Sequence, residues 1–145
     1  ESRGNIFFII PPVRTKTFKN DMQTLETATE IQRLINEHNK KFKIKINYGL
    51  SLNYGTIVTK EEHGKFKFMS MGTLITTTKK LANKSNEEIL MNDKFKERVQ
   101  TLTKSEKEDI SGLNAYKFKE IKKPVNHSTF ISGFMKRQKK ESSKN

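Results

Sequence analysis

The most regular pattern in the sequence is FKIKINYGLSL, which covers residues 42–52. Its apolar and polar residues alternate over the whole stretch, which is typical of a strand with one buried face. A turn is expected next, at residues 53–55, followed by a short strand at 56–58. His63-Gly64 then predicts the tip of a hairpin whose returning strand carries Phe66 and Phe68. We therefore expect residues 42–52 to form one strand of a sheet.

The segments on both sides of this strand alternate between strand and helix patterns. Residues 6–10 (IFFII) are continuously apolar and stop at two prolines, which predicts a central strand buried on both faces. Apolar residues recur every three or four positions over 20–39, which predicts an amphipathic helix with Asn20 or Asp21 as N-cap. The later patterns predict a helix at 72–83, a strand at 89–91, a short helix from 92 or 93 to 99, and a last strand at 116–121.

The resulting order, β-α-β-β-α-β-α-β, predicts an α+β domain over residues 1–125, with a mostly antiparallel sheet and helices packed on one face. A separate basic amphipathic tail is expected at 126–145. Ser128 caps its predicted helix, whose apolar stripe consists of Phe130, Ile131, Phe134 and Met135. That stripe is expected to dock on the sheet of the chain itself, to contact a partner or to form a connecting helix.

Composition limits the function classes. The chain has 145 residues and a net charge of +13, which favours phosphate-rich partners without choosing among RNA, DNA, anionic lipid and nucleotide. It contains no Cys, which excludes disulfides, thiolate nucleophiles and Cys-ligated zinc and predicts a cytoplasmic protein. Its longest apolar run is far shorter than the roughly 20 residues of a transmembrane helix, so no membrane span is expected.

Lysines alternate with apolar residues on three predicted strands, at Lys43 and Lys45, Lys65 and Lys67, and Lys117 and Lys119. If those strands are neighbours, their outward face becomes a positive surface that contacts phosphates without reading bases. The tail would extend this surface with Lys136, Arg137, Lys139 and Lys140. The alternative is that lysines only solubilise an exposed strand face and discourage edge aggregation.

Three strings combine into a family pattern: Gly4-Asn5 before the strand at 6–10, GLSLNYGTIV at 49–58, and GTLITTTKKL at 72–81. In order and spacing they resemble the catalytic domain of class III nucleotide cyclases, over about residues 3–122. The resemblance implies a nucleotide-cyclase-like fold, related to the ferredoxin-like fold. It also implies that the family's first strand, with one metal-binding aspartate, would lie before Glu1. The chain is then a fragment or processed form, or it assembles with a separate piece.

The resemblance implies five site positions, and all five are substituted. Asn5 stands where the family has its second metal-binding aspartate, and its amide removes one negative charge from a two-metal site. Thr76 and Lys80 replace an Asn and Arg pair that acts in the transition state, and lysine lacks the planar fork of arginine. Met69 replaces the residue that selects the base, and Glu1 replaces the lysine that assists it. We therefore expect no catalytic residue, metal or cofactor, with Thr76 and Lys80 as vestigial nucleotide contacts.

Three functions follow from these patterns. The first is a catalytically inactive cyclase-homology domain that acts as a dimerisation or regulatory module, with a second copy or another cyclase-like domain as partner and weak residual nucleotide binding. The second is a nucleic-acid or ribonucleoprotein-binding module that uses the lysine-rich face. The third is an active cyclase subunit completed by a competent partner. His38, His63 and His127 are isolated and show no metal-ligand spacing.

Overall fold

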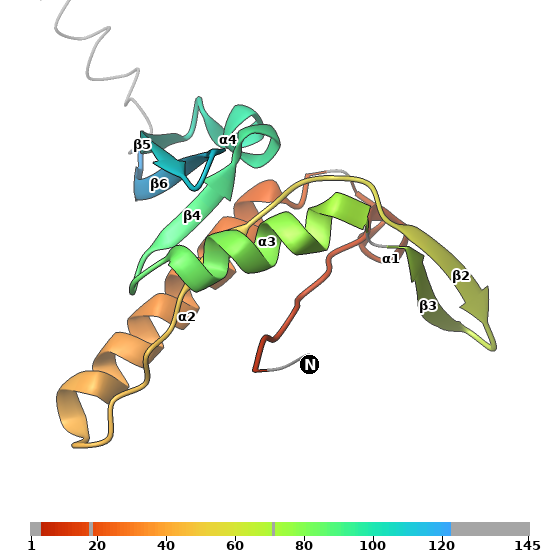
Figure 1. The fold of residues 1–145 in the computed structure, drawn as a ribbon. Helices are drawn as coiled ribbons and strands as arrows, with labels where there is room; N and C mark the ends of the chain where they lie inside the picture. The colour runs from red at the N-terminus through yellow and green to blue at the C-terminus, as the bar shows by residue number, and fades with distance from the viewer. Residues whose placement is uncertain (1–3, 18, 71, 123–145) are drawn as a thin grey trace, which may run out of the picture.

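A computed structural model describes residues 4–17, 19–70 and 72–122 (Figure 1). The predicted tail at 126–145 therefore lies outside the described residues. The elements in chain order are α1 (Pro12–Thr15), α2 (Asp21–Lys41), β1 (Leu50–Leu52), β2 (Val58–Glu62), β3 (Lys65–Ser70), α3 (Gly72–Lys84), β4 (Ile89–Asn92), α4 (Asp93–Val99), β5 (Thr103–Ile110) and β6 (Leu113–Ile121).

Four strands form the main sheet, in the order β1-β4-β6-β5. The β1–β4 pair is parallel, with Leu50 opposite Ile89 and Leu52 opposite Met91, whereas β4–β6 and β5–β6 are antiparallel. The β2–β3 hairpin forms a separate two-stranded sheet that projects from the body (Figure 1). The predicted α+β class is confirmed, with a mixed main sheet.

The core is centred on β4, whose residues Ile89, Leu90 and Met91 are all buried. Because successive side chains of a strand point to opposite faces, three consecutive buried residues require cover on both faces. Ile89 and Met91 pack with residues of α2 and α4, whereas Leu90 packs with Leu81 of α3. The prediction that the helices share one face is therefore wrong: α3 covers one face, and α2 and α4 cover the other (Figure 1).

The helices predicted at 20–39, 72–83 and 92 or 93 to 99 are confirmed, with changes at their ends. Asn20 occupies the N-cap position of α2, but its amide donates to the Oγ1 atom of Thr15 and to the carbonyl oxygen of Thr17 instead of capping the helix. At α4 the predicted cap forms, because Asn92 Oδ1 accepts a hydrogen bond of 2.9 Å from the Phe95 amide. The strand predicted at 89–91 is also confirmed, as β4.

Three predicted strands are wrong, shorter or displaced, and the one predicted at 56–58 shares only Val58 with β2. Residues 6–10 lie outside both sheets, and the side chains of Ile6 and Phe8 are 70% and 74% exposed. Of residues 42–52, only 50–52 form a strand. The reason lies at residue 46: the Asn39 side chain bonds both the amide and the carbonyl of Ile46, and β1 has a strand on one side only.

The hairpins show how turn chemistry defines the remaining strands. The predicted tip at His63-Gly64 is confirmed, and both residues have positive φ, as a tight hairpin turn requires. A second such turn at Ser111-Gly112 joins β5 to β6. β5 is absent from the sequence prediction because only Thr103 of its residues is buried, so it has no apolar pattern. β6 begins at residue 113, earlier than predicted.

Candidate functional site

The two vestigial nucleotide positions lie on α3. Thr76 and Lys80 are one helical turn apart and both are exposed. Lys80 forms no salt bridge within the described part of the chain. The arrangement therefore leaves one cation available to an anion from solvent.

The other positions of the predicted pocket are only partly described. Asn5 is half-buried and begins the N-terminal segment, residues 5–10. That segment approaches α3, because the Lys79 ammonium lies 5.5 Å from the centroid of the Phe7 ring. Met69 belongs to β3, and Glu1 lies outside the described residues. Within the described ranges, no group of three His, Asp or Glu side chains is placed to hold a metal ion.

The lysines predicted to share one sheet face lie in three separate places. Lys43 and Lys45 belong to an exposed connection that is not a strand, and Lys65 and Lys67 belong to the separate hairpin. Lys117 and Lys119 belong to β6, within the main sheet. The premise of three neighbouring strands is therefore wrong. Lys136, Arg137, Lys139 and Lys140 lie outside the described residues.

The two lysines of β6 are engaged with carboxylates. Lys117 pairs with Glu88, and a salt bridge of 2.7 Å joins Lys119 Nζ to Glu106 Oε2. The hydrogen bond from Lys117 to Glu88 raises the pKa of the lysine, and burial opposes this effect. These pairs reduce the positive potential that β6 presents to a phosphate.

A denser basic cluster lies at the distal end of α2, where we define the arm as residues 34–46. Lys40 and Lys41 are in the last turn of α2, and Lys43 and Lys45 follow in the connection. The Lys45 ammonium donates to the Asn39 carbonyl oxygen, whereas Lys40, Lys41 and Lys43 form no salt bridge with any described residue. The arm extends away from the sheet at one end of α2 (Figure 1).

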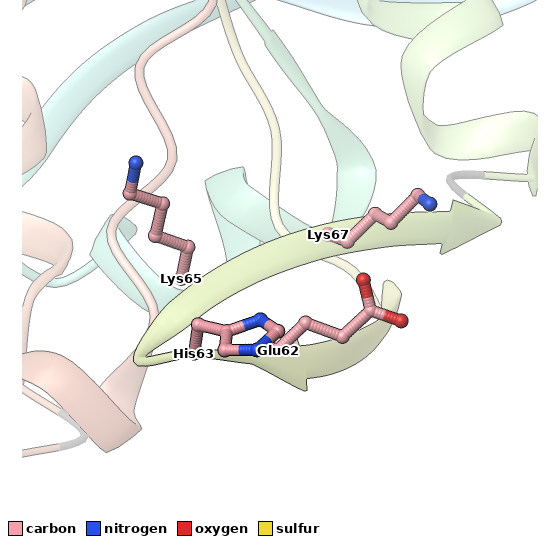
Figure 2. Close-up of a pocket in the computed structure, with 4 residues that line it drawn as sticks. All are labelled: Glu62, His63, Lys65 and Lys67. Atoms are coloured by element: carbon pink, nitrogen blue, oxygen red, sulfur yellow. The ribbon is translucent and has the colours of Figure 1, made fainter.

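The hairpin tip carries a shallow hollow of about 400 Å³, lined by Glu62, His63, Lys65 and Lys67 (Figure 2). A hydrogen bond from α1 holds the hairpin tip in place: the Arg14 guanidinium donates to the Gly64 carbonyl oxygen at 2.8 Å. A salt bridge of 2.8 Å between Lys60 and Glu62 adds a further charge pair on β2. The hollow is open to solvent, so its groups face water and have no enclosed volume in which to hold a small molecule.

Exposed apolar side chains recur at every second residue in two stripes. The N-terminal stripe consists of Ile6, Phe8 and Ile10, and the arm stripe consists of Phe42, Ile44 and Ile46. Ile44 is the most exposed of them, at 83%, and Phe42 is 56% exposed although its ring stacks on His38 at 4.5 Å. The sequence predicts both stripes to be core, because a continuous or an alternating apolar pattern looks the same whether or not another segment covers it.

A polar cluster that the sequence does not reveal joins three distant segments. Arg98 Nε donates to Asp21 Oδ1 at 2.8 Å, and the guanidinium carbon lies 4.2 Å from the centroid of the Tyr54 ring. The bond to Asp21 raises the pKa of Arg98, and burial opposes this effect. Through these two contacts Arg98 joins α4 to the start of α2 and to the loop after β1, so its role is structural.

Two general results complete the description of the site. Among the described residues, no helix has both the length and the apolar character needed to cross a membrane. Comparison of the chain with protein-family models, curated proteins and solved structures finds no match.

Proposed function

We propose that this chain is a catalytically inactive, cyclase-like module whose role is self-association, with weak residual affinity for nucleotides at Lys80. The observation that carries the proposal is the concentration of exposed apolar side chains in the first part of the chain. Of the described residues, eleven large hydrophobic side chains are exposed; nine of these precede residue 59, and six of the nine form the two stripes.

Exposed apolar surface of this kind favours association. Single exposed hydrophobic residues are normal on a protein surface, but residues that recur along one stripe are typical of an interaction site. Covering them removes apolar area from water, which stabilises the complex by roughly 25 cal/mol for each Å² of apolar surface buried. Among the later residues whose burial is described, β4 and α4 bury their apolar side chains in the core, and the exposed large hydrophobic residues are Leu102 and Ile121.

The inactive character is supported by the side chains at the aligned positions. Asn5 is neutral, and Lys80 carries its charge on an exposed helix face. An ammonium group attracts a triphosphate as a point charge but does not form the bidentate contact of a guanidinium. Residual nucleotide binding would then be weak, dependent on salt and independent of the base.

Sedimentation equilibrium of the full chain over a concentration series tests self-association. The expected result is a reversible dimer with twice the 16.9 kDa mass of one chain. A single monomeric species up to millimolar concentration would contradict the proposal. Incubation with ATP or GTP and manganese should yield no cyclic nucleotide, and product above the level of a protein-free control would show that the chain is an active cyclase subunit.

A second candidate function, binding of nucleic acid, is supported by the basic cluster of the arm. Lys40, Lys41 and Lys43 have no described acidic partner, so their charge is available to phosphates. Replacing these three lysines with Gln should weaken RNA binding and reduce its salt dependence, whereas Gln at Lys117 and Lys119 should change both less. Equal effects of the two sets, or no binding by the parent chain near physiological salt, would exclude the arm as an RNA site.

A further inference from the structure

We infer, on the basis of the self-association proposed above, that two copies of this chain exchange their N-terminal segments. In this dimer, residues 6–10 of each copy pair as an added strand with the arm of the other copy, along residues 42–46. The N-terminal stripe and the arm stripe thereby cover each other, and the pairing is made twice about a two-fold axis.

The geometry of β1 leaves this edge available. The Leu50 amide donates to the Glu88 carbonyl, and the Tyr48 carbonyl accepts from the Glu87 amide, so both residues direct these backbone groups toward β4. Since backbone groups alternate in direction along extended chain, Gly49 and Ser51 direct theirs to the opposite edge. In the part of the chain that is described, no strand pairs with that edge. Residues 45–49 continue this edge toward the arm, where residues 43 and 44 form a bend. The edge becomes a full template for another extended segment when that bend straightens on pairing.

The N-terminal segment matches this template in pattern. Phe7 and Ile9 are half-buried, and Phe7 lies under the Lys79 ammonium, so the alternate residues Ile6, Phe8 and Ile10 face solvent. Both stripes place three apolar residues at intervals of two. In antiparallel alignment they form three facing pairs: Ile6 with Ile46, Phe8 with Ile44, and Ile10 with Phe42. The following Pro11 lacks an amide donor and ends the ladder at a defined place.

Charge selects this segment over a second arm. If two arms paired about Ile44, Lys43 of each would face Lys45 of the other, and like charges directly opposite each other destabilise a sheet. Residues 5–10 carry no charge. They therefore cover the apolar side of the arm without repelling its lysines.

Pairing within one chain conflicts with the length of α2. The helix contains 21 residues and spans about 30 Å. The N-terminal segment and α1 precede its first turn, and the arm includes its last turns, so α2 holds the two segments apart. Figure 1 shows the two segments apart from each other within one chain. A second copy can bring its own segment to the arm without any change in α2.

Engineered cysteines test the exchange, because the chain contains no Cys of its own. Phe8→Cys and Ile44→Cys replace exposed side chains and should preserve the circular-dichroism spectrum. When the two single variants are mixed and oxidised, we expect a covalent heterodimer as the main product. A mixture of Phe8→Cys with His63→Cys, at the remote hairpin tip, serves as the matched control and should give at least tenfold less.

A charge substitution provides a second measurement on the same surface. Ile44→Lys should raise the dimer dissociation constant at least tenfold, whereas Lys43→Ala, on the other side of the same segment, should change it less than threefold. Efficient crosslinking together with this pattern supports the exchange. An internal disulfide in a monomeric Phe8→Cys/Ile44→Cys variant would overturn it.

The outcomes also separate this inference from the proposed function. A parent chain that remains monomeric in sedimentation would contradict both. If the parent chain dimerises, but the mixed variants form no specific disulfide between positions 8 and 44 and the dimer tolerates Ile44→Lys, the exchange is overturned. Self-association through another surface would then remain.

Discussion

The backbone of Gly49 approaches the carbonyl group of Ala82 so closely that a Cβ atom at position 49 would lie 2.0 Å from its oxygen. The Ser85 carbonyl oxygen would lie 2.7 Å from the same atom. Both oxygens belong to backbone, which cannot rotate away as a flexible side chain can. This contact seats the segment that leads into β1 against the end of α3 and explains why only glycine fits there.

The first prediction concerns this contact. Gly49→Ala should lower the free energy of unfolding by about 3 kcal/mol or more, because the new methyl group must push α3 away from the sheet. Urea unfolding followed by circular dichroism measures the change. Gly112→Ala is the control, since its Cβ would meet open space and the cost is only that of a residue with φ of +77°, about 1–2 kcal/mol. A Gly49 variant no less stable than the Gly112 variant would contradict the expected clash.

A second prediction concerns Asn92, which caps α4 and also bridges to the loop after β1. Its Oδ1 atom accepts from the amides of Phe95 and Tyr54, and its Nδ2 atom donates to the Tyr54 carbonyl at 3.4 Å. Asn92→Ala removes all three bonds and should cost about 1–2 kcal/mol in thermal unfolding. Asn92→Asp retains both acceptor bonds and should recover most of that loss. If Asp is as damaging as Ala, the cap is not the main contribution.

The core around β4 gives a third prediction. Leu90 is 1% exposed and packs on the face covered by α3. Leu90→Ala should therefore cost about 2–5 kcal/mol, through lost burial and the cavity that remains. Leu102→Ala removes the same atoms from a side chain that is substantially exposed, so its cost should be under about 1 kcal/mol. Chemical denaturation of both variants checks the difference, and similar costs would show that α3 does not cover this face.

A fourth prediction follows from the phenol of Tyr116. Burial raises the pKa of Tyr116, and the neighbouring carboxylates of Asp93 and Glu97 raise it further. The folded chain then holds the phenolic proton of Tyr116 more tightly than the unfolded chain, in which tyrosine has a pKa of about 10. The resulting stabilisation is complete below that pH and is lost as the pH rises through the folded-state pKa.

Ultraviolet titration of tyrosinate checks this assignment. Tyr116→Phe should remove a late-titrating component from the curve, and Asp93→Asn should shift that component to lower pH. A curve that Tyr116→Phe changes only at or below the ordinary tyrosine range would refute it.

The elements that could be predicted from sequence are those whose pattern and environment agree. α2 has a helical repeat, and its buried residues Leu25 and Ala28 pack on the sheet as that repeat requires. β4 is a short apolar run that is buried on both faces. For such segments, local preference and tertiary packing select the same structure.

The remaining elements could not be predicted because their state depends on neighbours distant in sequence. Residues 42–49 have a strand pattern, but no strand among the described residues lies beside them, and the Asn39 side chain forms hydrogen bonds with the backbone of Ile46. The contact of Arg98 with Asp21 joins residues 77 positions apart, so no local sequence pattern predicts it. Likewise, the spacing of lysines cannot show that Lys117 faces Glu88, whereas Lys43 has no acidic neighbour within the described chain.

The charged edge strand β5 carries a consequence for how this sequence can diverge. It joins the sheet through its pairing with β6, and of its residues only Thr103 is buried. Its solvent-facing side chains can therefore change in size and sign over evolutionary time with little penalty to the fold, whereas Ile110 packs against the buried cluster of Leu81, Leu90 and Ala115 and should stay apolar. Close relatives of this chain should then differ widely in the net charge of this edge. The residues of β4, in contrast, should vary only among apolar side chains of similar volume.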